Sequence, residues 1–264
     1  MTLMGLALSA DLSTSVAARP IGDLLRQWRQ RRRLSQMALA LDAEISPKHL
    51  SFVESGRARP SRDLVLRLGE QLALPLREQN RLLLSAGYAP IFQQRPLEHP
   101  DLQMARKAMQ LILTGHEPFP ALAIDRHWNM VAANQSVAHF MGGVGESLLS
   151  PVTNVLRLSL HPLGLAPRIV NLTQWRAHIF ARLQQQINLT GDPVLVDLLH
   201  ELRALPDREG GTSPARYDTE LHSPVVPLLL RSGDQILSFL STTMVFGTPI
   251  DVTLSELAIK TVRS

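Results

Sequence analysis

The sequence contains no cysteine among its 264 residues. This absence excludes disulfide bonds, thiolate metal sites, cysteine nucleophiles and redox-sensing thiols. It fits the reducing cytoplasm, where we expect the protein to act. No apolar run reaches the roughly 18–20 residues that a membrane helix needs. The apolar stretch at residues 1–10 has no basic residue before it, unlike a signal peptide. We therefore expect no membrane insertion and interpret residues 1–18 as a flexible tail.

Motifs of the common enzyme classes are also missing. The sequence has no G-x-S-x-G elbow, no H-E-x-x-H zinc motif, no G-x-x-x-x-G-K-[ST] phosphate loop and no G-x-G-x-x-G dinucleotide motif. Its nine histidines are scattered without the spacing of metal ligands. We therefore expect no catalytic residues, no metal site and no resident cofactor, and predict that the protein is not an enzyme.

Charge is sparse and unevenly distributed. The 27 basic and 23 acidic residues give a net charge of +4, and only three of the basic residues are lysines. Residues 19–62 contain ten basic and four acidic residues, a balance of +6, so the rest of the chain carries −2. A concentration of positive charge in one segment indicates a nucleic-acid-binding region.

Five short helices are predicted between residues 19 and 88. The first has an apolar stripe at helical spacing, formed by Ile21, Leu24, Leu25 and Trp28. Serine is a favoured N-cap, and three later helices are expected to begin directly after Ser35, Ser46 and Ser61. Gly56 and Gly87 are expected to end helices. Short helices joined by tight turns are typical of a helix-turn-helix domain.

Residues 35–61 make this prediction specific. Their sequence is S-Q-M-A-L-A-L-D-A-E-I-S-P-K-H-L-S-F-V-E-S-G-R-A-R-P-S. This run resembles the phage-repressor-like (Xre) family of DNA-binding domains almost position for position. One departure is Glu44, at a turn position where the family commonly has glycine. A left-handed backbone there would strain a glutamate. The resemblance implies a five-helix repressor-like domain at residues 19–88.

A recognition helix enters the major groove by its N-terminal end. In the helix after Ser46, Lys48 could donate to guanine, Ser51 to several bases, and Phe52 could contact a thymine methyl group. The resemblance implies that Gln36 grips a phosphate and braces this helix, and that the arginines after Gly56 lie near the DNA backbone. The predicted DNA-binding residues are Ser35, Gln36, Ser46, Pro47, Lys48, His49, Ser51, Phe52, Arg57 and Arg59.

Such a domain reads one half-site of double-stranded DNA, so we expect a homodimer on an operator with half-sites about 34–36 Å apart. The alternative interpretation of these basic residues is an ordinary solvated surface.

The length of the chain leaves room for a second domain, since domains commonly have about 100–200 residues. Residues 89–100 contain three prolines and are interpreted as a linker. The second domain is then expected at 101–264, beginning with helical spacing over 101–115.

Short apolar strands are predicted at 121–124 and 128–132, on either side of a polar turn. Asn134 is expected to cap a helix that ends at Gly142. This order of strand, turn, strand and helix is how PAS-type sensor domains begin.

The remaining segments complete the predicted fold. Residues 151–205 are expected to be helical in three pieces, followed by a polar loop at 206–223. Two apolar β runs, 224–231 and 236–246, are expected to form a hairpin, and a helix from Thr253 to end the chain. We therefore predict a mainly α chain with an α+β second domain, a PAS-like α/β ligand-binding domain.

Several stretches resemble MmyB-like transcription regulators, whose C-terminal domain binds a ligand. They are A-G-Y-A-P, P-A-L-A-I-D-R-H-W-N, R-L-S-L-H-P-L-G-L-A-P-R-I-V-N-L-T-Q-W-R, T-G-D-P and S-F-L-S-T-T-M-V-F-G-T-P-I-D-V-T-L-S-E-L-A. The resemblance covers nearly the whole chain from about Ile21. It implies a PAS-like pocket that holds a long-chain fatty acid or a similar small apolar ligand as effector.

Such a ligand needs an apolar tunnel and a donor for its carboxylate. The candidate donors are Arg157, His161 and the pair Trp175 and Arg176. The candidate lining residues are Trp128, Phe140, Phe239 and Phe246. The alternative interpretation is that the aromatic residues are ordinary core and that an arginine after a tryptophan pairs with an acid.

The sequence therefore predicts a DNA-binding transcription regulator with a lipid-sensing domain. Two alternatives stay open: a ligand-independent repressor whose second domain is a protein–protein interaction module, and an enzyme with a DNA-binding head, which the missing motifs disfavour.

Overall fold

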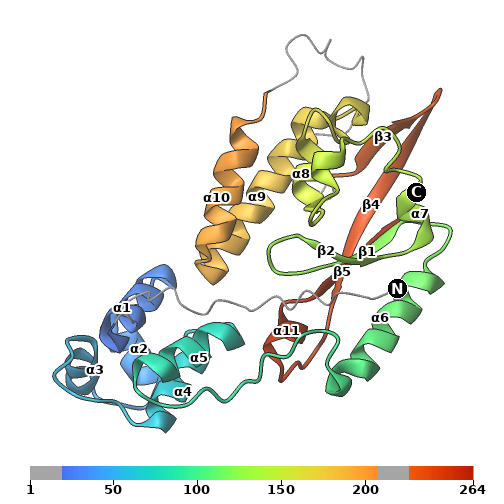
Figure 1. Cartoon of the computed structure of the whole chain (residues 1–264). Coiled ribbons are helices and arrows are strands. Elements are labelled where there is room, and N and C mark those ends of the chain that lie inside the picture. Colours follow the sequence, from blue (N-terminus) through green and yellow to red (C-terminus); the bar gives the residue numbers. More distant parts are fainter. Residues whose placement is uncertain (1–19, 207–225, 264) are drawn as a thin grey trace. The chain divides into compact units, whose positions relative to one another are not determined.

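A computed structural model describes residues 20–206 and 226–263 of the chain (Figure 1). The tail predicted at 1–18 and nearly all of the loop predicted at 206–223 lie outside these residues. The chain divides into two compact units, the first ending at Ile91 and the second beginning at Phe92. Within the described ranges, no helix combines the length and the apolar character that a bilayer crossing needs.

The first unit is built from the five predicted helices. They are α1 (Ile21–Arg31), α2 (Gln36–Asp42), α3 (Pro47–Glu54), α4 (Arg62–Gln71) and α5 (Leu76–Ser85). The hydroxyls of Ser35, Ser46 and Ser61 each accept a hydrogen bond from a backbone N–H in the first turn of α2, α3 and α4, respectively. The predicted caps are therefore confirmed, and each satisfies a donor that the helix itself leaves unpaired.

One core holds these helices together. Leu25, Leu39, Leu50, Leu68 and Leu83, one from each helix, are fully buried in it. Helices α1 and α3 approach so closely that a Cβ atom on Gly22 would lie 2.4 Å from the carbonyl oxygen of Glu54. Only glycine fits there, and the contact fixes α3 against the body of the unit.

The second unit contains a five-stranded antiparallel sheet with the strand order β2-β1-β5-β4-β3. The strands are β1 (Ala121–Ile124), β2 (Met130–Ala133), β3 (Leu228–Ser232), β4 (Gln235–Val245) and β5 (Ala258–Arg263). The longer helices are α6 (Gln103–Gly115), α9 (Leu172–Thr190) and α10 (Pro193–Ala204). Shorter ones are α7 (Gln135–Ala138), α8 (Val155–Leu160) and α11 (Val252–Ser255), with 3-10 turns at Pro100–Leu102, Glu146–Leu148 and Ala166–Arg168.

Helices pack against both faces of this sheet. On one face, Met109 and Leu113 of α6 pack against Ala123 of β1 and Ile259 of β5. On the other, α8, α9 and α10 share a core with Ile124 and Trp128 (Figure 1). The chain is therefore mainly α with an α+β second unit, as predicted.

The end of the chain corrects the sequence prediction. The helix expected from Thr253 is the single turn α11, and it is followed by strand β5, which pairs with both β1 and β4. The sequence Ala258 to Val262 alternates between the two faces, as a strand between two neighbours requires. The centre of the sheet therefore comes from a segment that we predicted to be helical.

Two details around β2 also differ from the prediction. Trp128 lies in the turn before the strand with a left-handed φ of 69°, instead of starting the strand. Asn134 precedes α7, which ends at Ala138, but its side chain does not cap the helix. Its amide oxygen accepts from the backbone N–H of Ala121, and its amide nitrogen donates to the carbonyl of Phe119.

The segment predicted as a linker, 89–100, forms hydrogen bonds near its start with both units. The backbone N–H of Ile91 donates to Asn80 Oδ1 of α5, 3.1 Å away. The carbonyl of Gln93 accepts from the N–H of Val252, the first residue of α11, at 2.8 Å. The first unit therefore extends to Ile91, and the second begins at the next residue, Phe92.

Candidate functional site: a DNA-binding helix and a ligand cavity

The position of α3 is set by a buried carboxylate at its C-terminal end. The side chain of Glu54 is fully buried and accepts two hydrogen bonds from Arg29 of α1, at 2.7 and 2.9 Å. Gln36 of α2 donates a third, at 2.8 Å. Burial by itself raises the pKa of Glu54, but the bonds from Arg29 and Gln36 and the charges of Arg29 and Arg26 outweigh it and hold the pKa below its usual range. The carboxylate thus joins α1, α2 and α3.

The exposed side of α3 combines positive charge with an aromatic ring. The ammonium of Lys48 lies 5.7 Å from the centre of the Phe52 ring, and the guanidinium of Arg57 lies 5.8 Å from it. Lys48 and Arg57 are exposed, and Phe52, His49 and Ser51 are partly exposed. This surface offers cationic donors beside an apolar face, which is what contact with bases and phosphates requires.

Other predicted DNA-binding residues also have structural roles. Ser35 and Ser46 use their hydroxyls as caps, and Pro47 occupies the first turn of α3. Gln36 braces α3 through Glu54, although its contact with a phosphate stays a prediction. Arg59 donates two hydrogen bonds to the carbonyl of Ala86, at 3.0 and 3.3 Å. Its guanidinium therefore links the loop after α3 to the end of α5.

The second unit contains an apolar cavity of about 180 Å³ between the sheet and helices α8 and α9. The residues that line it are apolar except for Ser159, His178, Arg182, Ser241 and Lys260. A mostly apolar cavity with a few polar groups is the usual form of a small-molecule site.

Three of the four predicted lining residues surround this cavity: Trp128, Phe140 and Phe239. Trp175, which we predicted with Arg176 as a carboxylate donor, also lines it. Phe140 and Phe239 meet edge to face, with ring centres 5.6 Å apart. Phe246 is not among the lining residues, because it packs with the α6 side of the sheet.

The other predicted carboxylate donors, Arg157, His161 and Arg176, lie outside the cavity, and each has another partner. Arg157 forms a two-pronged ion pair with Glu201 of α10, with both N–O distances 2.7 Å. Arg176 is buried and donates to the carbonyls of Leu205 and Pro206. The ring of His161 accepts from the backbone N–H of Leu163. None of the three is in the lining.

The basic residues that do line the cavity were missed from the sequence: His178 and Arg182 on α9 and Lys260 on β5. A signal for the first two existed. Trp175, His178, Ile179 and Arg182 are spaced i, i+3, i+4 and i+7, so they share one face of α9. Lys260 was missed because we predicted that its segment forms a terminal helix.

Burial lowers the pKa of all three groups. Desolvation, together with the charge of Arg182, lowers the pKa of Lys260 to about 7. Desolvation and the charges of Arg182 and Lys260 lower the pKa of His178, and desolvation lowers that of Arg182. The cavity therefore holds positive charge at a cost, and an anion would relieve it.

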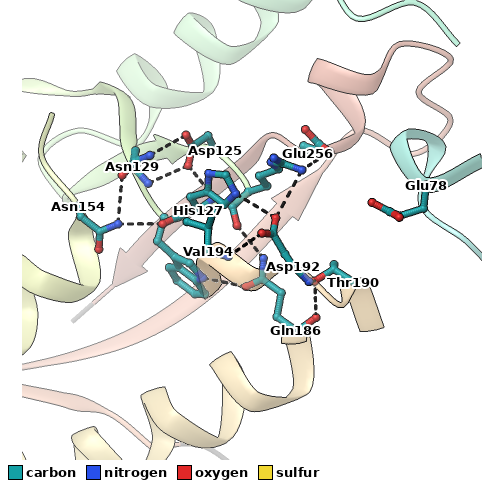
Figure 2. Close-up of polar contacts among 12 residues, drawn as sticks. Glu78, Asp125, His127, Asn129, Asn154, Gln186, Thr190, Asp192, Val194 and Glu256 are labelled. Carbon is teal, nitrogen blue, oxygen red and sulfur yellow. Dashed lines mark hydrogen bonds and ion pairs between the residues drawn. The ribbon is translucent and has the colours of Figure 1, made fainter. Parts of the chain in front are cut away.

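A polar network that includes Asp125 and Gln186 holds the turn around Trp128 (Figure 2). The indole N–H of Trp128 donates to Gln186 Oε1 of α9 at 2.8 Å, and Gln186 in turn donates to the carbonyl of Arg126. Asp125 accepts from the backbone N–H groups of His127 and Asn129. These bonds hold the turn in which Trp128 adopts its left-handed backbone.

The same turn is tied to the start of α10. His127 Nε2 and Asp192 Oδ2 are 3.0 Å apart, and Arg126 lies within 3.4 Å of the same carboxylate (Figure 2). Asp192 also caps α10 by accepting from the N–H of Val194. These contacts are structural. Nowhere in the described ranges do three histidine, aspartate or glutamate side chains gather as metal ligands would.

Comparison with known protein families gives two matches. A family described as MmyB-like transcription regulator ligand binding domain matches residues 105–264. A family described as helix-turn-helix domain matches residues 20–82. No curated protein matches the chain significantly. The two family matches correspond to the second and first units, respectively.

Proposed function

Because this chain belongs to the MmyB-like transcription regulators, we propose that its ligand is a fatty acid or a related lipid. The two family matches make the chain a DNA-binding regulator with a ligand-binding domain. The observation that supports this proposal is the cavity, which is apolar along most of its wall and carries positive charge in one region. An acyl chain would fill the apolar part and a carboxylate would lie against the basic residues.

Ligand binding would act on transcription by shifting a population. A ligand can change operator affinity only by as much as its affinities for two arrangements of the protein differ. We propose that the protein binds its operator as a homodimer in the cytoplasm, one helix-turn-helix unit on each half-site. It would act by binding alone, without catalysis.

The DNA contacts can be tested with a pair of variants. Lys48→Ala should relax sequence preference, with a loss of about 1–3 kcal/mol if Lys48 makes a good base contact. Arg57→Ala should weaken binding to all sequences and reduce the slope of log affinity against log salt by about one. Binding isotherms over a salt series separate the two effects. Equal loss of specificity in both variants would contradict this assignment.

The ligand can be tested directly on purified protein. Native mass spectrometry should show a bound species that dissociates on denaturation, with the mass of a lipid. Lipid-free protein should then bind dodecanoate, and the emission of Trp128 and Trp175, which both line the cavity, should change. A protein that carries no lipid and binds none would contradict the proposal. It would favour a second unit that binds a protein partner.

A further inference from the structure

A second cavity adjoins the apolar one. It has a volume of about 330 Å³, and Asp125, Arg126, Gln185, Gln186 and Glu256 are among the residues around it. Trp128, Arg182 and Lys260 line both cavities. These three side chains therefore form a wall between the apolar cavity and one with more polar residues around it, and we call them the shared wall.

The shared wall brings two cations together. Arg182 Nη2 and Lys260 Nζ both donate to the hydroxyl of Thr243, at 2.8 and 2.6 Å. Both also lie over the Trp128 ring, at 5.5 and 4.8 Å from its centre. Contact with the π face offsets part of the cost of burying a cation. Both charged groups are thus held in place before any ligand binds.

In the described part of the chain, these two cations have no carboxylate partner. Across residues 20–206 and 226–263, no salt bridge joins Arg182 or Lys260 to a carboxylate. The acids of the second cavity have other partners, since Asp125 accepts bonds from its own turn and Glu256 lies 3.6 Å from Arg126. His178 adds a third basic group on the apolar side. Lys260 is buried and Arg182 beside it is partly exposed. Holding a buried cation next to a second cation, with no acid among the described residues to pair with either, is costly in a structural role, and an incoming anion would pair with both.

The geometry points to an anionic single-chain amphiphile as the ligand, with its acid group bound by Arg182 and Lys260 at the shared wall and its chain in the apolar cavity. The inference rests on the proposed function, because it assigns the polar end of the same ligand. The lowered pKa of Lys260 agrees with it, since a bound acid would supply the missing counter-charge. The second cavity lies on the head-group side, where polar side chains and water complete the solvation of the acid.

The test compares two ligands that differ only at the head group. Dodecanoate and 1-dodecanol have the same chain length, and their dissociation constants for the lipid-free full chain can be measured by calorimetry below micelle formation. Wild-type protein should bind dodecanoate about 10- to 100-fold more tightly, because a hydrogen bond to a charged group replaces a neutral one. Lys260→Met and Arg182→Met should each abolish most of that preference while retaining 1-dodecanol binding.

Two further variants control the comparison. Lys260→Arg keeps the charge and should keep the preference for the acid. Arg157→Met removes a cation that is paired with Glu201 outside both cavities and should leave both affinities unchanged. Equal affinity of wild-type protein for acid and alcohol would overturn the head-group assignment and leave the lipid site intact. Binding of neither ligand would overturn the proposed function itself.

Discussion

Lys260 should destabilise the ligand-free protein, and Lys260→Met should reverse this effect. An ordinary lysine has a pKa near 10.4, whereas burial and Arg182 lower the pKa of Lys260 to about 7. Each pKa unit corresponds to about 1.4 kcal/mol, so a pKa lowered by about three units means that holding this lysine in the cavity at pH 7 costs about 4 kcal/mol. We expect Lys260→Met to raise the unfolding free energy of the second unit by about that amount.

The pH dependence gives this prediction its sign. A lysine whose folded pKa is lowered binds fewer protons in the folded state, so wild-type stability should rise between pH 7 and pH 10. The advantage of Lys260→Met should therefore shrink by about 2–3 kcal/mol from pH 6 to pH 9. Urea unfolding at both pH values measures it, with Lys107→Met on the exposed surface of α6 as the matched control. A destabilised Lys260→Met protein, or an advantage independent of pH, would refute the reasoning.

Three further predictions concern the first unit. Glu54→Ala should cost about 3–5 kcal/mol of its unfolding free energy, because it leaves Arg29 unpaired beside α3, and thermal unfolding measures this loss. Because the pKa of Glu54 is lowered, its stabilising effect is present above pH 4–5 and lost as pH falls through the folded pKa, so Glu54→Gln should flatten the acid unfolding curve. Glu44→Gly should stabilise the unit by about 0.5–1 kcal/mol, because Glu44 has a φ of 55° and its contact with Arg67 is exposed. Unchanged or reduced urea stability in Glu44→Gly would contradict that assignment of strain.

The helices of the first unit could be predicted because their signals are local. A serine before an apolar stripe fixes where a helix begins, and the caps at Ser35, Ser46 and Ser61 involve residues only three positions apart. The turn at Glu44 is also set by local sequence. Its backbone has the left-handed conformation expected at this position, although the residue is glutamate instead of glycine.

Strand β5 could not be predicted in this way. Ala258–Arg263 becomes a strand by pairing with β1, which lies more than 130 residues earlier, and with β4. The residues before it include good helix formers, so local propensity alone led us to extend the predicted helix into this segment. Tertiary pairing decided the outcome.

Only part of the ligand site could be predicted from the sequence, because its basic residues come together through tertiary structure. The family resemblance led us to expect an apolar pocket, and three of the four predicted aromatic residues, Trp128, Phe140 and Phe239, line the cavity, whereas Phe246 does not. The basic residues depend on which face of α9 and which face of β5 point inward. Only the assembled sheet brings Arg182 and Lys260 onto one hydroxyl of Thr243.

The central claim is that a bound lipid changes the affinity of this regulator for DNA. The direct measurement is a pair of binding isotherms, at one stated salt concentration, for lipid-free and dodecanoate-saturated protein on an operator selected from random DNA. Allosteric coupling of ordinary size predicts dissociation constants that differ by about 5-fold or more, in either direction. Superimposable isotherms, with dodecanoate bound in both the absence and the presence of DNA, would contradict the account.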